Sequence, residues 1–394
     1  MKIEEINKVC FVGAGTMGCF NALTAAIAGY QVTIYDLSLK TLMDVDNRQK
    51  AIGALLINHG LATPSIIDDA MTRVLVEKNL EKAVAEAELI SESVFEDVQI
   101  KRDVHRRLDE LCEKTTLITT NTSNLLVSQI EDVLQHGERF AALHSHLGSP
   151  LVDIVAGPRT SADVTRLLQR YVSSLGGVPL VLEKENPGYV LNAMLGPLLT
   201  TAMQLVIAGV ASKEQVDRAW MLDRDAAMGP FGMMDLFGIN IIFDSWKRKP
   251  ENADLNHQKI QVLSFLTPFI ERNELGMKTG KGFYQYPNPD YQKSDFILPV
   301  AAVELSRRAL ITPLIANAIA LVDKKILAPA DIDRAWMAGT HLAQGPFSML
   351  EDIGIAEYQV MLGEQCRAGL CSAELAATAE RYFRESDLYQ EQLL

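Results

Sequence analysis

Phe11-Val12-Gly13-Ala14-Gly15-Thr16-Met17-Gly18 is the stretch that decides the fold of this chain of 394 residues. The apolar run 9–12 enters it and predicts a strand, and residues 17–28 leave it with a helical pattern. Between them, the glycines at 13, 15 and 18 have the spacing of the dinucleotide fingerprint. The stretch therefore predicts a strand, a tight turn and a helix that together hold a dinucleotide.

The glycines and the start of the helix each have a physical role in that turn. Gly13 permits the tight bend, Gly15 lets the backbone approach a pyrophosphate, and Gly18 lets the helix pack close to the strand. The first helical residues, Thr16 and Met17, offer unpaired N–H groups and a partial positive charge to the phosphates. We therefore expect all five residues to contact the cofactor.

The cofactor is expected to be NAD because of the residue that ends the second predicted strand. This strand, 32–35, is followed by Asp36. An acidic side chain there can hydrogen-bond both ribose hydroxyls of NAD and repel the 2′-phosphate of NADP. The alternative, a glycine-rich turn of some other α/β protein, is disfavoured because strand, glycines, helix and acid follow in the expected order.

Composition and charge exclude several classes of protein. The net charge of −13 argues against a general nucleic-acid binder, and no apolar run is long enough to span a membrane. The acidic N-terminal residues do not resemble a signal peptide. Five scattered cysteines show neither metal-ligand nor redox spacing: Cys10, Cys19, Cys112, Cys366 and Cys371. We therefore expect a cytoplasmic protein that acts on a small molecule, with no metal, nucleic-acid partner or membrane partner.

Strands that alternate with helices up to residue 185 predict an α/β domain with a Rossmann-like, doubly wound sheet. The sheet is expected to be parallel, with room for antiparallel strands near its end. After the first two strands, further strands are predicted at 74–76, 89–93, 117–120, 140–144, 151–155 and 179–182. The pattern then changes: Asn186 is a predicted helix N-cap and Pro187 the first helical residue.

The remainder of the chain is helical in pattern and repeats itself. Asp217-Arg218-Ala219-Trp220-Met221 recurs as Asp333-Arg334-Ala335-Trp336-Met337, and Gly229-Pro230-Phe231 recurs as Gly345-Pro346-Phe347, each 116 residues later. Such a repeat indicates a duplicated helical domain. We therefore expect two tandem all-α domains after the sheet, at 186–300 and 301–394, with a linker near 286–290.

Titratable residues after the later strands are the candidates for chemistry, since ligands bind outside the carboxyl edge of such a sheet. His144 ends one predicted strand and Asp153 lies in the next. An imidazole can take the proton of an alcohol while a hydride leaves the same carbon, and a carboxylate can fix its tautomer. Ser123 offers a hydroxyl to the substrate oxygen. His146 is a rival base because it shares a face with His144 in an extended segment, and a purely structural role for either histidine stays open.

In order and combination, several motifs of the sequence resemble the L-3-hydroxyacyl-CoA dehydrogenase family over most of the chain. The motifs are the fingerprint with Asp36, SESVFE at 91–96, NTS at 121–123, LH at 143–144, LVDIV at 151–155, NPGYVLN at 186–192, GPF at 229–231 and GMKTGKGFY at 276–284.

The resemblance implies roles for individual residues. His144 is implied as the acid/base, and Ser123 and Asn192 as hydrogen-bonding groups near the substrate oxygen and the nicotinamide. Asn192 belongs to the helical region, so the implied active site lies between domains. Further implied cofactor contacts are Glu96, Lys101 and Asn121.

Three departures from the family pattern stand out. Asp153 stands where the family usually has glutamate, whose side chain is one methylene longer. The loop 145–150 is a few residues shorter than the family's loop after the histidine and reshapes the wall of the substrate pocket. Asn192 aligns with Arg308 across the repeat, so the second copy lacks the asparagine and is interpreted as structural.

We therefore expect NAD-dependent, reversible oxidation of an L-3-hydroxyacyl thioester to the 3-keto product. Two alternatives stay open. One is a dehydrogenase of a free 3-hydroxy acid, such as a sugar acid or a carnitine-like compound. The other is a weakly catalytic NADH-binding protein, as in the lens crystallins that resemble this family. Single-copy members of the family pair through the helical domain, so the second copy is expected to act as an internal partner in a monomer, or in a dimer that uses another surface.

Overall fold

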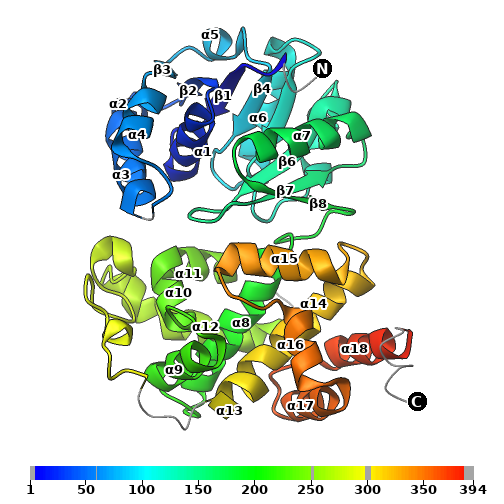
Figure 1. Ribbon diagram of the computed structural model, residues 1–394. Coiled ribbons are helices and arrows are strands. Elements are labelled where there is room, and N and C mark those ends of the chain that lie inside the picture. The colour runs from blue at the N-terminus through cyan, green and yellow to red at the C-terminus, as the bar shows by residue number, and fades with distance from the viewer. Residues whose placement is uncertain (1–4, 59, 250–252, 298–302, 386–394) are drawn as a thin grey trace. The chain divides into compact units, whose positions relative to one another are not determined.

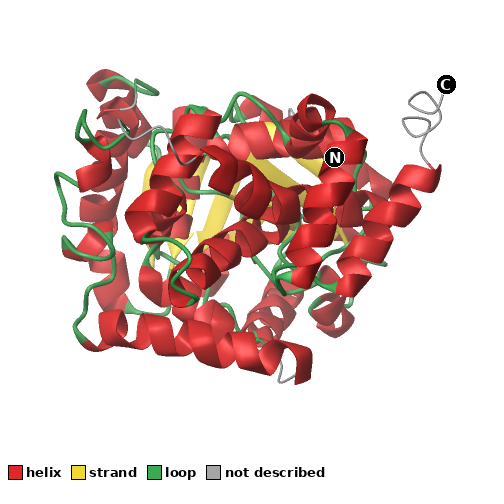
Figure 2. Ribbon diagram, turned by 90° about the horizontal axis from the view of Figure 1, so that it is seen from below, coloured by secondary structure: helices red, strands yellow, loops and turns green. Residues whose placement is uncertain are grey.

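The computed structural model describes residues 5–58, 60–249, 253–297 and 303–385. The chain forms two compact units. The first consists of Met1–Val190 with Lys325–Leu327 and Ala338–Thr340, and the second of the other residues from Leu191 onward. All strands of the described residues belong to the first unit, while the second is built from helices (Figure 1, Figure 2).

A single sheet forms the centre of the first unit. Its strands are β1 (Lys8–Val12), β2 (Gln31–Tyr35), β3 (Val74–Glu77), β4 (Leu89–Glu92), β5 (Leu117–Thr120), β6 (Phe140–Ser145), β7 (Leu151–Ala156) and β8 (Val178–Leu182). They lie in the order β3-β2-β1-β4-β5-β6-β7-β8, and all neighbours are parallel except β6 and β7. The first six follow the strand order of dinucleotide-binding sheets, so the predicted doubly wound sheet with a late antiparallel pair is confirmed.

Helices pack against this sheet and complete its hydrophobic core. They are α1 (Thr16–Ile27), α2 (Leu39–Met43), α3 (Val45–Asn58), α4 (Pro64–Met71), α5 (Leu80–Val84), α6 (Val98–Leu111) and α7 (Ala162–Ser174). The helix after the glycine turn, α1, packs against β1 and β2 through small, fully buried residues such as Ala22 and Ala26. Small side chains let the helix axis approach the sheet closely, which fixes the position of the helix N-terminus.

The segment that joins the two units differs from the sequence prediction. Asn186 does not cap a helix and Pro187 does not begin one, since the next helix begins at Leu191. Gly188 and Tyr189 have φ angles of +74° and +48°, in the left-handed region that an α-helix cannot use. The Asn186 amide instead donates to the carbonyl oxygen of Tyr189 at 2.8 Å and so closes a turn. The prediction of an N-cap was wrong because the same amide stabilises this non-helical turn.

The second unit consists of helices. They are α8 (Leu191–Ile207), α9 (Lys213–Arg224), α10 (Pro230–Phe237), α11 (Ile239–Arg248), α12 (Ala253–Glu271), α13 (Val303–Leu305), α14 (Thr312–Asp323), α15 (Pro329–Thr340), α16 (Pro346–Ile353), α17 (Ile355–Arg367) and α18 (Ala373–Glu385). Among the residues that the structure describes, none of the helices is both long enough and apolar enough to cross a membrane.

The repeated sequence motifs have the same structural purpose in each half of this unit. Asp217 on α9 accepts hydrogen bonds from the backbone N–H groups of the first turn of α10 at 2.8 and 3.0 Å. Asp333 on α15 does the same for α16 at 2.7 and 2.9 Å. Glycines 229 and 345 permit this approach, because a Cβ at either would lie 2.3 or 2.4 Å from the aspartate Cα. Each aspartate therefore caps the following helix, although it lies on the preceding helix and not at the N-cap position.

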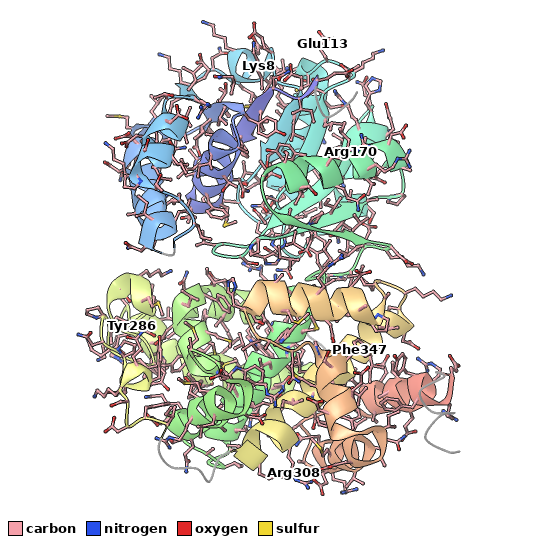
Figure 3. The ribbon with its side chains drawn as sticks, viewed as in Figure 1. Lys8, Glu113, Arg170, Tyr286, Arg308 and Phe347 are labelled. Carbon is pink, nitrogen blue, oxygen red and sulfur yellow. The ribbon has the colours of Figure 1, made fainter. Side chains whose placement is uncertain are left out.

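The helices that correspond in the two copies also pack against each other. Helix α14 contacts α8, and an offset of 116 aligns it with residues 196–207 of α8. An element that faces its own copy is the arrangement of a two-fold interface. In the second copy, Arg308, which is labelled in Figure 3, stands at the position of Asn192. It pairs with Glu364 at 2.7 Å and with Glu304. The second copy therefore carries an ion pair where the first carries the asparagine.

Candidate active site

The glycine turn between β1 and α1 has the backbone geometry that its sequence predicts. Gly13 has a φ angle of +108°, and its N–H donates to the carbonyl oxygen of Tyr35 at 2.8 Å. A Cβ on Gly18 would lie only 1.8 Å from the carbonyl oxygen of Gly13, so the helix could not start so close to the turn with any other residue. A Cβ on Gly15, in contrast, would meet nothing within 4 Å. The open space at Gly15 suits a group that approaches the backbone from outside.

The start of α1 fits an anionic ligand. Its N-cap is Gly15, with no side-chain hydrogen bond to the first turn, and Thr16 is exposed. The first N–H groups of a helix without a capping side chain can be satisfied by a phosphate. Asp36 lies at the end of β2, where its carboxylate accepts hydrogen bonds from the backbone of Ala14 and Ser38, both at 2.8 Å. Asp36 is thus tied to the glycine turn, and its contact with an adenine ribose stays a prediction.

The β6–β7 hairpin brings His144 and Asp153 together. The two residues are directly opposite each other in the antiparallel register, so their side chains lie on the same face of the sheet. His144 Nδ1 lies 2.9 Å from Asp153 Oδ2. The short loop after β6 closes with a hydrogen bond from Ser149 N–H to the carbonyl oxygen of His146 at 3.1 Å. Because this tight hairpin sets the register, the short side chain of Asp153 reaches the histidine.

Ser123 completes a line of three side chains. Its Oγ lies 3.0 Å from Nε2 of His144, on the opposite side of the imidazole from Asp153. The loop that carries Ser123 is held by Glu96, whose Oε1 accepts from the Thr122 hydroxyl at 2.6 Å and from the Ser123 N–H at 2.9 Å. Glu96 therefore organises the loop that positions the serine. Its contact with a bound cofactor stays a prediction.

The protonation states in this line follow from its burial and hydrogen bonds. Burial raises the pKa of the Asp153 carboxyl, but the hydrogen bonds from the neighbouring histidines outweigh it and hold the pKa well below the usual value. Burial lowers the pKa of His144, and so does His146, while Asp153 acts in the opposite direction. The carboxylate can only accept, so His144 carries its proton on Nδ1 and presents the lone pair of Nε2. A neutral imidazole with a free Nε2 can accept a proton from an alcohol.

His146, the rival base, reaches the same carboxylate. Its Nε2 lies 2.9 Å from Asp153 Oδ2, the oxygen that His144 also contacts. The two imidazole rings meet edge to face with centroids 4.3 Å apart. These three side chains are the one group of the described residues with three potential metal ligands in reach of one another. The N–O distances of 2.9 Å are those of two hydrogen bonds to one oxygen.

Lys101 does not lie on the surface of the site. Its side chain is completely buried, and its ammonium binds Glu92 Oε1 at 2.7 Å. The other oxygen of Glu92 is 2.9 Å from Nε2 of His105 and 2.7 Å from the hydroxyl of Thr120. This buried network anchors the end of β4 to α6, and the sequence analysis missed both Glu92 and His105. Glu92 belongs to the quoted motif 91–96, but nothing local in the sequence marks it as buried.

Two further predicted site residues, Asn121 and Asn192, lie in different units of the chain. Asn121 links three strand ends: its amide donates to Ser93 Oγ at 3.2 Å, and its Oδ1 accepts from the Ser145 N–H at 3.1 Å. Ser145 in turn donates to Asn21 of α1 at 2.6 Å. Asn121 thereby ties the histidine hairpin to the glycine-turn helix. Asn192 lies on α8 in the second unit, so its place beside the substrate stays a prediction.

Comparison with known families gives two matches that together cover most of the chain. The family model described as 3-hydroxyacyl-CoA dehydrogenase, NAD binding domain, matches residues 8–186. The model described as 3-hydroxyacyl-CoA dehydrogenase, C-terminal domain, matches residues 188–286 and 307–391.

Individual relatives agree with these matches. The chain is 28% identical to the 3-hydroxybutyryl-CoA dehydrogenase of Clostridioides difficile over 296 residues, which cover 71% of this chain and 99% of that protein. It is also 28% identical to the human mitochondrial hydroxyacyl-coenzyme A dehydrogenase over 292 residues, 71% of this chain and 91% of that protein. The crystal structure of 3-hydroxybutyryl-CoA dehydrogenase from Escherichia coli covers 99% of this chain and 98% of its own, with a TM-score of 0.77 at 20% identity. That structure therefore shares the whole fold, including the part after residue 300.

Proposed function

This chain belongs to the 3-hydroxyacyl-CoA dehydrogenase family, and from that membership and its site we propose that it oxidises an L-3-hydroxyacyl thioester reversibly to the 3-keto product. It is an NAD-dependent oxidoreductase. The observation that carries the proposal is the line Ser123–His144–Asp153, with distances of 3.0 and 2.9 Å. A line of this kind is what proton removal from an alcohol requires.

The cofactor fit rests on the glycine turn. Gly15 leaves open space for a pyrophosphate, the first turn of α1 has no capping side chain, and Asp36, tied to the glycine turn, is proposed to bind the adenine ribose. When bound, NAD accepts the hydride from the substrate carbon. Glu96, Lys101 and Asn121 are proposed as further cofactor contacts, and their hydrogen bonds also hold the loops and strand ends around the site. Asn192 is proposed to reach the substrate from α8.

The protein groups move one proton. Ser123 Oγ would hydrogen-bond the substrate hydroxyl, and Nε2 of His144 would take the hydroxyl proton as the same carbon loses its hydride. The C–O single bond becomes the carbonyl of the product, and His144 becomes an imidazolium. Asp153 keeps the proton of His144 on Nδ1 and stabilises the imidazolium charge. In the reverse direction the imidazolium returns the proton to the carbonyl oxygen.

The proposal is tested by supplying NAD with matched hydroxy substrates. The substrates are L-3-hydroxybutyryl-CoA, its D enantiomer, and free L-3-hydroxybutyrate. We expect NADH to form with the L thioester, with the D enantiomer and the free acid slower by at least about tenfold. Faster turnover of the free acid would replace the thioester with a free 3-hydroxy acid as the substrate class. No turnover with any of them would favour a binding role.

We also propose that the second helical copy, from about Glu304 onward, replaces a partner subunit. The packing of α8 against its own counterpart α14 supports this, as does the buried surface of α14. The expected state is a monomer, or a dimer that uses another surface. The proposed division into 1–185, 186–300 and 301–394 follows from the same repeat. A cytoplasmic location is proposed from the scattered cysteines.

A further inference from the structure

Asp153 is a buried carboxylate whose hydrogen bonds all fall on one oxygen. Its Oδ2 lies 2.9 Å from His144 Nδ1 and 2.9 Å from His146 Nε2. Its Oδ1 is buried and has no hydrogen-bond partner among the described residues. Because a carboxylate can only accept, both histidines must present an N–H to the same oxygen. The two rings therefore compete for one acceptor.

The two histidines differ in their access to solvent. The side chain of His144 is 6% exposed and that of Asp153 is completely buried, whereas the side chain of His146 is 12% exposed. Other groups that face His144 come from different elements: Ser123 and Glu96 on the loops after β5 and β4, and Tyr189, whose ring centroid is 5.3 Å away. Burial raises the pKa of Tyr189, so it stays neutral throughout the range in which a histidine titrates. His146 is thus the more exposed of the two histidines that share Asp153.

We propose that His146 is a positioning residue which, by sharing Asp153 Oδ2 with His144, sets the pH range in which His144 is an unprotonated base. The inference rests on the proposed function only for its kinetic consequence, since the shared hydrogen bond exists without substrate.

The physical reason is that His144 and His146 share the stabilisation that the carboxylate of Asp153 offers to a protonated imidazole. A carboxylate that accepts one N–H from an imidazole favours the protonated form of that imidazole. A second donor on the same oxygen withdraws part of this effect, and a positive charge on His146 would oppose a second charge 4.3 Å away, measured between ring centroids. His146 therefore keeps His144 neutral at lower pH than Asp153 alone would allow. The direction agrees with the lowered pKa of His144, for which burial is the largest cause and His146 the second.

The test is a titration of His144 in the full-length, cofactor-free protein. Carbon-13 NMR of labelled histidine reports each ring, and the His144 resonance is identified by its loss in His144→Gln. In His146→Phe, which removes the donor, we expect the His144 midpoint to rise by about one pH unit. In His146→Gln, whose amide still donates to Asp153, the midpoint should rise by less than half as much. The acid limb of kcat/KM for oxidation should move by the same amounts.

Several outcomes would overturn the inference. A His144 midpoint that is the same in His146→Phe as in the wild type shows that sharing Asp153 has no effect on His144. A wild-type His144 midpoint at or above that of a free imidazole would also refute the inference, even if both variants failed to fold. The NMR titration needs no substrate, so its failure is separate from a failure of the proposed dehydrogenase activity. Melting temperature and NADH affinity of each variant serve as controls for folding.

Discussion

Replacement of Asp153 by asparagine is the sharpest test of the proposed proton transfer. The carboxylate lies 2.9 Å from Nδ1 of His144, which becomes an imidazolium when it takes the substrate proton. A hydrogen bond to a charged group is worth about 1.5–3 kcal/mol, which is about 10–10² in rate. The side chain of asparagine also carries an NH₂ group in place of one of the two carboxylate oxygens. If that NH₂ faces Nδ1, the imidazole adopts the tautomer whose Nε2 is protonated and cannot accept the substrate proton. We therefore expect Asp153→Asn to lower kcat by about 10² or more.

The assay is steady-state NADH formation from L-3-hydroxybutyryl-CoA, with NADH affinity measured separately by fluorescence. The matched control is Asp109→Asn, which removes the charge of another buried aspartate in the same unit, paired with Arg139 at 2.7 Å. That variant should lose stability but keep its turnover. An Asp153→Asn enzyme with the turnover of the wild type would refute the role given to the His144–Asp153 pair.

Three other predictions test different parts of the account. His144→Gln should lose about 10²–10⁴ in turnover while NADH still binds, and His146→Gln should lose much less; the opposite ranking in the NADH assay would identify His146 as the base. Asp36 should give NAD at least about a 10²-fold advantage over NADP in kcat/KM, because a like charge at the 2′-phosphate costs several kcal/mol; equal efficiencies would contradict this. Truncation after Val300 should expose the face of α8 that α14 covers and cause aggregation or a new dimer in size-exclusion chromatography; a soluble, monomeric fragment as heat-stable as the full chain would show that the second copy is no internal partner.

Features that depend on neighbouring residues were predictable from the sequence. The glycine turn is one, because Gly13 and Gly18 face constraints within the same eight residues: a positive φ angle and a close approach to the Gly13 carbonyl. The strands of the sheet are another, because most contain a short run of apolar or β-branched residues between turns. The repeat was also visible, since the five-residue motif that begins at Asp217 recurs 116 residues later, beginning at Asp333.

Features that depend on distant partners were not predictable in the same way. The contact between Asp153 and His144 depends on hairpin register and loop length, which the residue types alone do not give. The sequence presents His144 and His146 as alternative bases. In the structure both donate a hydrogen bond to Oδ2 of Asp153. Lys101 was placed at the cofactor by resemblance, and its buried pair with Glu92 depends on the approach of α6 to β4.

Asn186, near the end of the first unit, is a residue whose local sequence favoured the wrong structure. Asn186 followed by proline is a good helix start by local rules, yet the chain turns through Gly188 and Tyr189 before α8 begins. The amide of Asn186 satisfies carbonyl oxygens of that turn instead of helix N–H groups. Local propensity allowed both structures, and the turn was selected by hydrogen bonds that the spacing does not reveal.

The central claim is that this chain transfers a hydride to and from an acyl thioester with His144 as the proton carrier. The most direct measurement is NADH oxidation by the wild type and by His144→Gln with acetoacetyl-CoA, longer 3-ketoacyl-CoAs and free acetoacetate. The account predicts rapid oxidation by the wild type with the CoA thioesters, little with free acetoacetate, and a loss of about 10²–10⁴ in His144→Gln. Oxidation that is equally fast with the free acid, or that survives in His144→Gln, would contradict it.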